Sequence, residues 1–286
     1  MNPVGIYEKA FPDELTWNER LDQAARCGYD FMEMSIDESE QRLSRLEWST
    51  SNRLELRRMV ENSGVPILTM GLSCHRKYAL GSKTPENRQK GLEIFRNAID
   101  LAYDLDVRII QLMGYDVYYE QSDTETQERF LEGLSQGARW ASAAGVMLAL
   151  ENVDVDTVNS VEKAIRFVRE VNSPWLGLYP DIGNLVAAGY DPVKQLAYAQ
   201  GHLVGIHVKD ALPGEVRGVT LGKGHVPFDD VFKYLGGLDY SGPFAVEMWA
   251  HLDATGDPVT SAIEARRWVG CLISDYIIQT NRRMKD

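Results

Sequence analysis

The chain has 286 residues, of which 44% are hydrophobic and 25% charged, a composition typical of globular proteins and a length at which an α/β barrel forms one domain. Its formal net charge of −12 argues against nucleic acid as the main partner, because proteins that bind nucleic acids usually carry a basic surface. No apolar run approaches the length of about 18 residues that marks a transmembrane helix, so we expect no membrane partner.

The three cysteines, Cys27, Cys74 and Cys271, are far apart, and no CxxC spacing occurs. Neither a disulfide framework nor a cysteine-ligated zinc site is expected, and a reducing compartment is the simple interpretation. The first residues, MNPVGIYEKAFPDE, lack the basic region and apolar core of a signal peptide. We therefore expect a cytoplasmic protein.

Short apolar runs rich in β-branched residues alternate along the chain with longer amphipathic runs, a pattern that predicts alternating strands and helices. The predicted strands are 4–7, 31–36, 67–72, 108–114, 146–152, 176–181, 204–209 and 244–249. The predicted helices are 16–27, 51–63, 86–104, 124–143, 160–171, 191–200, 228–236 and 258–279.

Residues suited to helix ends flank many of these runs. Glycines that can adopt a left-handed conformation follow three of the helices, at Gly28, Gly64 and Gly145. Side chains that cap helix N-termini, or Pro in the first turn, precede others. These predicted starts are Thr16, Ser51, Thr84 with Pro85, Ser160, Asp191 with Pro192, and Asp257 with Pro258.

Strand–helix alternation predicts a parallel sheet, because parallel pairing needs crossover connections. Eight such units favour a closed (β/α)₈ TIM barrel over a doubly wound sheet. No GxGxxG follows the first strand and no GxxxxGK[ST] occurs, which also argues against a nucleotide-binding doubly wound fold. No linker or composition break divides the chain, so residues 1–286 are interpreted as one domain.

Each of the last four predicted strands ends at an ionisable residue. The stretches GVMLALENVDVD, LGLYPDIGN, LVGIHVKD and PFAVEMW place Glu151, Asp181, His207 and Glu247 there. Active sites of (β/α)₈ barrels lie at the carboxyl ends of the strands. The four side chains are therefore expected to converge on one patch of the barrel mouth.

Three neighbouring carboxylates repel one another unless one is protonated or a cation lies between them. Oxygen-rich ligation with one imidazole suits Mn²⁺, Mg²⁺, Co²⁺ or Zn²⁺. Taken singly, each residue has a simpler explanation as a solvated loop residue, a helix cap or a structural histidine, but their occurrence on four successive strands favours a shared site for one divalent ion.

A metal at this position could polarise a carbonyl and stabilise the enediolate that forms when an adjacent carbon loses its proton. Glu151 and Glu247 are separated by two strands, so they approach the mouth from opposite sides. One could remove a proton as general base while the other delivers a proton to the opposite face as general acid. This arrangement suits stereochemical inversion.

Basic and polar residues after other strands are candidates for substrate binding. His75, Arg76 and Lys77 follow the third strand and could face an anionic group, although a solvated loop explains them equally well. Lys209 points the same way as His207 by strand alternation, so it could contact substrate or pair with a carboxylate. Asn184, three residues after Asp181, could reach a substrate hydroxyl or simply form a turn.

The glycine-rich stretch GEVRGVTLGKGHVPF follows the seventh strand and carries Arg217, Lys223 and His225. Barrel enzymes often bind phosphate at the loops after strands seven and eight, so this loop is a phosphate-binding candidate. Three tyrosines after the fourth strand could line the pocket or serve only in packing, namely Tyr115, Tyr118 and Tyr119. His202, before the seventh strand, is interpreted as structural.

The strand endings around the four ionisable residues look like the metal site of the xylose-isomerase-like TIM barrels. More narrowly, the strings GIYEKAF, DFMEMSIDES, RLSRLEWS, QLMGYDVYYE, YPDIGNL and VEMW resemble the bacterial L-ribulose-5-phosphate 3-epimerase family. The likeness runs from Gly5 to about Trp268. Members of that family interconvert L-xylulose 5-phosphate and L-ribulose 5-phosphate in L-ascorbate and related pentose catabolism.

The resemblance implies that Glu151, Asp181, His207 and Glu247 ligate one divalent metal, and that the two glutamates are the acid and base acting at C3 through a cis-enediolate. It implies a small phosphorylated ketopentose as the substrate and a homodimer as the assembly. Arg217 matches a substrate-contacting arginine of related ketose 3-epimerases.

Two departures from the family pattern bear on substrate contacts. The related ketose 3-epimerases place a histidine where this chain has Asn184, and NVDVDT follows Glu151 where the narrower family has IMD. The substrate contact of Asn184 and the contacts near the fifth strand are therefore expected to differ from those of the relatives.

Other functions use the same site. A non-phosphorylated ketose 3-epimerase or an aldose–ketose isomerase would share the metal chemistry, and a sugar-binding sensor on a barrel scaffold would share the fold. The related DNA-repair endonucleases are disfavoured, because five histidines in total and a net charge of −12 provide neither the ligands of a multinuclear zinc cluster nor a basic face.

Overall fold

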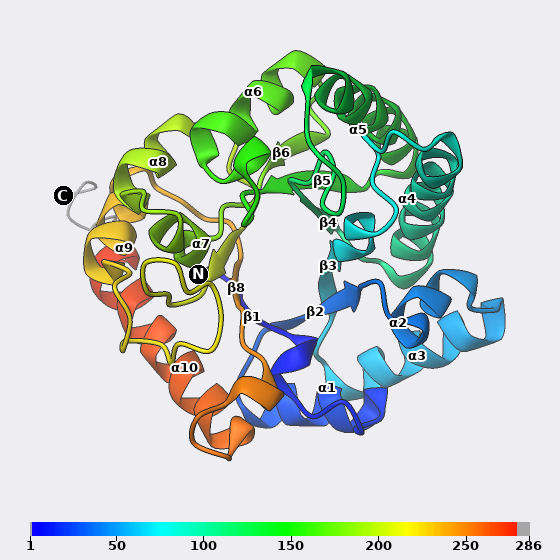
Figure 1. The fold of residues 1–286 in the computed structure, drawn as a ribbon. Coiled ribbons are helices and arrows are strands. Elements are labelled where there is room, and N and C mark those ends of the chain that lie inside the picture. The colour runs from blue at the N-terminus through cyan, green and yellow to red at the C-terminus, as the bar shows by residue number, and fades with distance from the viewer. Residues whose placement is uncertain (1, 279–286) are drawn as a thin grey trace.

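The computed structural model describes residues 2–278. Parallel strands form a ring at the centre of the molecule, and helices surround that ring (Figure 1). The strands are β1 (Val4–Tyr7), β2 (Phe31–Ile36), β3 (Ile67–Leu72), β4 (Ile109–Met113), β5 (Met147–Glu151), β6 (Leu176–Leu178), β7 (Ile206–Val208) and β8 (Phe244–Val246).

The strands pair in chain order around the ring, as β6-β5-β4-β3-β2-β1-β8-β7. Single parallel bridges join the two ends of this sheet, between Leu178 and Leu203 and between Asp181 and His207. Strands β5 to β8 are therefore consecutive neighbours. The predicted (β/α)₈ TIM-barrel fold is confirmed.

The main helices follow the strands along the chain. They are α1 (Trp17–Arg26), α3 (Thr50–Ser63), α4 (Pro85–Leu105), α5 (Thr124–Ala144), α6 (Val161–Val171), α8 (Pro192–Tyr198), α9 (Phe228–Gly237) and α10 (Pro258–Leu272), which continues as a π-helical turn, Ile273–Ile278. Two short helices were not expected from the sequence, namely α2 (Glu40–Leu43) and α7 (Ile182–Ala187). Residue 279, the last of the predicted final helix, lies outside the described residues.

Most of the predicted helix ends correspond to real caps, with two exceptions: the Thr84 side chain at the start of α4 accepts no capping hydrogen bond, and Ser51 lies inside α3. Ser51 was expected to begin a helix, but Ser49 is the cap, because its hydroxyl accepts the Asn52 N–H while the Asn52 side chain accepts from the Ser49 N–H. This helix therefore begins where a reciprocal pair is available. At the helix starts, the predicted caps whose side chains accept backbone hydrogen bonds are Thr16, Ser160, Asp191 and Asp257. At the helix ends, the three predicted glycines have positive φ, namely Gly28, Gly64 and Gly145.

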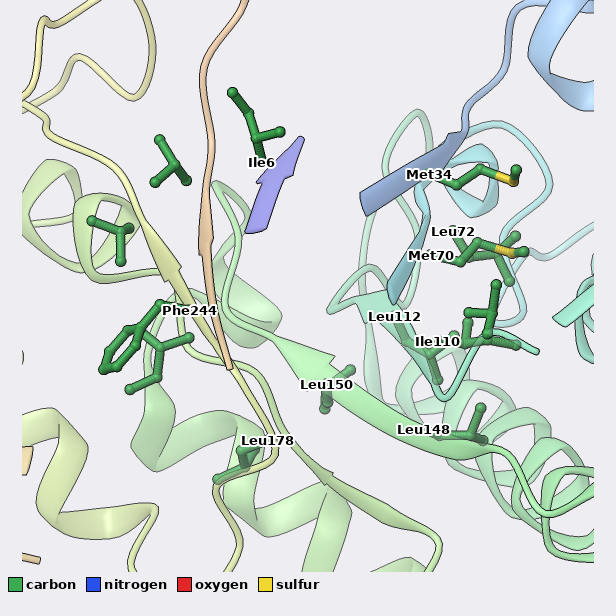
Figure 2. Close-up of a cluster of buried hydrophobic side chains, with 14 of the residues drawn as sticks. Ile6, Met34, Met70, Leu72, Ile110, Leu112, Leu148, Leu150, Leu178 and Phe244 are labelled. Atoms are coloured by element: carbon green, nitrogen blue, oxygen red, sulfur yellow. The ribbon is translucent and has the colours of Figure 1, made fainter. Parts of the chain in front are cut away.

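Alternation along the strands separates two buried layers. Outward-facing side chains pack against the helices in one large cluster, of which Ile6, Leu112 and Phe244 are members (Figure 2). A smaller cluster fills the inside of the barrel and includes Phe31 and Tyr179. The floor of the ring is thus a packed core, and only its mouth remains available for polar chemistry.

Two strands end three residues earlier than the apolar pattern predicts. β6 stops at Leu178 and β8 at Val246. In the first case Pro180 has no N–H to donate to a ladder, and Asp181 then becomes the N-cap of α7. The ionisable residues of these strands therefore lie on the first turn beyond the sheet.

Candidate active site and metal centre

The side chains of the four ionisable residues that end β5 to β8 meet at the barrel mouth. Ligand atoms of Glu151, Asp181, His207 and Glu247 all lie within 4.8 Å of one another. The Nδ1 atom of His207 is 3.2 Å from a Glu151 oxygen, 3.8 Å from an Asp181 oxygen and 3.6 Å from a Glu247 oxygen. The predicted convergence is present, and the group could hold a metal ion.

Asp181 is held in place through its backbone and through its capping role. The side chain of Asn152 accepts from the Asp181 N–H at 3.0 Å and donates to the Asp181 carbonyl at 3.0 Å. One carboxylate oxygen of Asp181 accepts the Asn184 N–H at 2.8 Å, which leaves the other oxygen directed at the cluster. The polar residue directly after Glu151 therefore fixes the neighbouring ligand.

Lys209 is the cation within the cluster. Its ammonium lies 2.7 Å from an Asp181 oxygen and 2.8 Å from a Glu247 oxygen, and it donates to the Asn184 side-chain oxygen at 2.9 Å. Its inward direction follows from alternation with His207, two residues earlier. The structure thus places Lys209 against carboxylates, one of the two roles considered for it.

The electrostatics of the site follow from burial and from this lysine. Burial raises the pKa of Glu151, and it raises the pKa of Asp181 to about 7 although Lys209 attracts the charged form. Burial acts in the same direction on Glu247, but Lys209 and His207 outweigh it and lower its pKa to about 2. Buried carboxylates whose ionisation is resisted in this way favour a further cation.

The donor set fits a divalent ion of the hard or borderline type. Three carboxylates and one imidazole are ligands that Mn²⁺, Mg²⁺, Co²⁺ and Zn²⁺ accept, and no thiolate is near to favour a softer metal. Glu151, Asp181 and His207 are nearly inaccessible to solvent, while Glu247 is partly open to the cavity. Ligands from four elements can therefore surround an ion that remains reachable from one side.

A cavity of about 340 Å³ opens beside the cluster. The metal-facing end is lined by Glu151, Glu247, Lys209 and Asn184. The remaining wall comes from the loops after β1 to β5 and after β7 and β8, and it includes Tyr7, Lys9, Asp37, Glu38, Ser39, Ser73, Arg76, Met113, Tyr115, Val153, Asp154, Val216, Arg217 and Trp249.

Two arginines predicted as substrate contacts line this cavity. Arg76 donates to the Tyr115 hydroxyl at 2.9 Å and lies over the rings of Tyr115 and Tyr118, with its Nε atom buried and without a hydrogen-bond partner. Arg217 is exposed and lies 5.6 Å from the Trp249 ring centre. Neither guanidinium forms an ion pair with a carboxylate in the part of the chain that the structure describes.

Other sequence candidates lie elsewhere. His75 does not line the cavity, because its ring is buried under α4, hydrogen-bonds the Gly91 carbonyl at 3.1 Å and packs edge-on against Phe95. His225 lines a separate surface cavity near α8 and α9. Lys77 and Lys223 are exposed.

The aromatic candidates divide in a similar way. Tyr115 is part of the cavity wall, and Tyr118 packs between Tyr115 and Tyr119. Tyr119 is exposed, and its hydroxyl donates to Glu38 at 3.0 Å. His202 lines a separate cavity around residues that begin β6 and precede β7, at the opposite end of the barrel.

Two polar residues of the site were not identified from the sequence. Glu33, in the middle of β2, lies 2.7 Å from the Nε2 atom of His207, and Gln111 of β4 approaches the same imidazole at 3.1 Å. Both are fully buried. The available signal was a polar residue inside an apolar strand, as in FMEMSI and IIQLM.

In residues 2–278, no helix is both long enough and apolar enough to cross a membrane.

A parallel barrel with three carboxylates and an imidazole at the carboxyl ends of its strands has the form of a metal-assisted barrel enzyme. Residues 21–270 match the family model described as xylose isomerase-like TIM barrel. The chain is 45% identical over 267 residues to L-ribulose-5-phosphate 3-epimerase UlaE of Shigella sonnei (strain Ss046), with 93% of each chain covered. UlaE of Escherichia coli (strain SMS-3-5 / SECEC) shows the same identity and coverage.

Solved structures share the architecture at much lower identity. L-ribulose 3-epimerase has a TM-score of 0.81 and 18% identity, with 100% of this chain and 97% of that chain covered. D-psicose 3-epimerase in the presence of D-fructose has a TM-score of 0.79 and 17% identity, with 96% and 99% covered. The chain belongs to the xylose isomerase-like TIM barrel family and, within it, to the L-ribulose-5-phosphate 3-epimerase family. It is an enzyme of the isomerase class, an epimerase.

Proposed function

We propose that this enzyme interconverts L-xylulose 5-phosphate and L-ribulose 5-phosphate by epimerisation at C3. The observation that carries the proposal is the placement of Glu151 and Glu247, which both line the cavity and both belong to the cluster of possible metal ligands. The substrate is supported by the curated relatives, which are named L-ribulose-5-phosphate 3-epimerase.

The two glutamates supply the proton transfers. They follow β5 and β8, with β6 and β7 between them, so their carboxylates reach a bound sugar from different sides. One accepts the proton from C3, and the other donates a proton to the opposite face of the resulting cis-enediolate. Because the reaction is reversible, the glutamates exchange these roles when the other epimer is the substrate.

The rest of the cluster supports this chemistry. Glu151, Asp181, His207 and Glu247 would hold one divalent ion, which would supply Lewis-acid stabilisation for the negative charge that develops on the enediolate. Lys209 keeps Asp181 and Glu247 together through its two ion pairs.

The arginines of the cavity suit the phosphate end of the substrate. Arg76 and Arg217 line the cavity without a carboxylate partner among the described residues, whereas Lys9, on the same wall, is paired with Asp37 at 2.6 Å. A guanidinium with an unused N–H can bind a phosphate oxygen through a charge-assisted hydrogen bond. Arg76 is held in place by its hydrogen bond to the Tyr115 hydroxyl, whereas Arg217 is exposed, so Arg76 is the better-positioned candidate of the two.

Deuterium exchange at C3 tests the proposed reaction. The metal-loaded enzyme is incubated with either ketose phosphate in D₂O, and we expect label at C3 together with the other epimer by NMR. Label at C1 would instead indicate an aldose–ketose isomerase, and exchange only with a free ketose would refute the phosphosugar substrate. A sugar-binding sensor would show neither exchange nor epimerisation.

Single glutamate variants test the two-base arrangement at saturating Mn²⁺. E151Q and E247Q should each lose epimerisation, because one face of C3 has lost its proton carrier. Each variant should still wash deuterium into one epimer, and the two variants should act on opposite epimers. Exchange of both epimers by either variant would contradict the assignment of one glutamate to each face.

The phosphate contact is tested with R76M. Loss of a hydrogen bond to a charged group weakens binding by roughly 1.5–3 kcal/mol, which is about 10- to 100-fold. We expect KM for the ketose phosphate to rise by that factor with kcat little changed. R166M, at a residue that lines a different cavity, is the control, and an unchanged KM in R76M would exclude this contact.

A further inference from the structure

Glu33 is a buried carboxylate directly behind the candidate metal ligand His207. It lies in β2, is fully inaccessible to solvent and points into the barrel. Its Oε1 atom is 2.7 Å from the Nε2 atom of His207, and its Oε2 atom accepts a hydrogen bond from the Thr69 hydroxyl at 2.7 Å. The Tyr179 hydroxyl donates to the same Oε2 atom at 3.4 Å.

The surroundings of Glu33 give no other reason for a charge at this position. No lysine or arginine in residues 2–278 forms an ion pair with it, and the ionisable side chain at ion-pair distance from it is His207. The other side chains around it inside the barrel are apolar, such as Phe31, or polar without charge, such as Thr69 and Gln111. Burying a carboxylate without a cationic partner is expensive, so an apolar residue would serve packing better.

The hydrogen bond determines which nitrogen of His207 is left for an ion. An acceptor at 2.7 Å makes Nε2 a donor, so in the neutral ring that a metal ion requires, the lone pair is on Nδ1, the nitrogen that faces the cluster 3.2 Å from Glu151 and 3.6 Å from Glu247. Tyr179 packs edge-on against the imidazole with ring centres 5.1 Å apart. The ring is thus fixed both in direction and in tilt.

We propose that Glu33 is a positioning residue for the metal site, holding His207 through Nε2 so that Nδ1 faces the ion. This inference rests on the proposed metal site. A carboxylate behind a ligating histidine orients the ring and increases its basicity as a ligand, and loss of such partners typically lowers metal affinity by about 10- to 100-fold. Thr69, which holds the far oxygen of Glu33, contributes to the same arrangement.

Metal binding by the chelator-stripped full-length protein tests the role without relying on turnover. Co²⁺ is titrated by calorimetry, and its visible absorption spectrum reports on the ligand field. We expect E33Q, which keeps an oxygen acceptor but loses the charge, to bind Co²⁺ about 10-fold more weakly than the wild type. E33L should approach a 100-fold loss with an altered spectrum, and T69V should show a smaller loss than E33L.

The outcomes separate this inference from the proposed function. Suppose that the wild type binds Co²⁺ and that both variants, E33Q and E33L, bind it with the same affinity and spectrum. Glu33 then does not position His207, while the proposed metal site stands. If the wild type binds no divalent ion, the metal site and the inference fall together. A merely structural Glu33 would lower the melting temperature of the apoprotein and leave the Co²⁺ affinity of the folded protein unchanged. Should E33L not fold, E33Q and T69V provide the same comparison.

Discussion

The buried imidazole of His75 should make folding stability depend on pH, and the size of the effect follows from its environment. Burial lowers the pKa of His75 to about 4, because a protonated ring is poorly solvated there. A histidine in the unfolded chain titrates near 6.5. The difference between these two pKa values, at about 1.36 kcal/mol for each tenfold change in proton affinity, corresponds to about 3 kcal/mol.

The sign of the effect follows from proton binding. Between pH 6.5 and about 4 the unfolded chain binds a proton at this residue and the native protein does not, so acid favours unfolding. The contribution of a neutral, buried His75 is therefore fully present above pH 6.5. It is lost progressively as the pH falls and is gone below a pH of about 4.

Urea unfolding of the chelator-stripped protein at several pH values from 7.5 to 4.5 measures this term. H75Q removes the titrating group while keeping a donor for the Gly91 carbonyl, so its free energy of unfolding should fall by roughly 2–3 kcal/mol less than that of the wild type over this range. H251Q, at an exposed histidine, is the control and should follow the wild type. Parallel pH profiles for H75Q and the wild type would refute the reasoning, and a strong rise in KM for H75Q would restore His75 as a substrate contact.

Three further perturbations test the site and its surroundings. K209M removes the cation between Asp181 and Glu247, so the apoprotein should lose about 3–5 kcal/mol in urea unfolding, and a divalent ion should raise the melting temperature of this variant more than that of the wild type. An added Cβ at Gly224 would lie 2.2 Å from the Asp210 carboxylate oxygen, so G224A should release its loop, detected as faster proteolysis there; an unchanged rate would contradict this. A divalent ion at about 100 times its dissociation constant should stabilise the wild type by about 2.7 kcal/mol, reversibly with EDTA, and no shift would argue against the metal site.

The four possible metal ligands could be predicted because barrel topology converts chain order into spatial order. Glu151, Asp181, His207 and Glu247 end successive strands, and successive strands of such a barrel are neighbours. Their common edge therefore follows from the fold alone. The prediction needed no exact strand boundary, and it survives although β6 and β8 end before their ionisable residues.

Residues that act from outside the strand ends could not be placed in the same way. Glu33 interrupts the apolar strand FMEMSI, but nothing in the sequence indicates that its partner is His207, 174 positions later. His75 is adjacent to Arg76 in sequence, yet the 3-10 turn Ser73–Arg76 directs the imidazole under α4 and the guanidinium into the cavity. Rotation within a single turn decides between a structural and a substrate-facing role, and local sequence patterns do not report it.

The NVDVDT segment after Glu151 forms part of the cavity wall through Val153 and Asp154, and two features make it a fixed wall. The Val153 N–H donates to the Val158 carbonyl at 2.8 Å, and the Thr157 hydroxyl donates to the fully buried Asp116 at 2.7 Å.

Asp116 follows β4 and also accepts hydrogen bonds from the hydroxyls of Ser122 and Thr126 at 2.6 Å each. The loops after β4 and β5 are therefore joined through one buried carboxylate, and the loop after β4 carries Tyr115, which hydrogen-bonds Arg76. Because Asp116 joins the two loops, a change in NVDVDT would move two parts of the cavity wall. One is the part that NVDVDT forms, and the other is the loop after β4, whose Tyr115 holds Arg76, the proposed phosphate contact. We therefore expect a substitution in either loop, and not only in the hexapeptide, to change substrate preference.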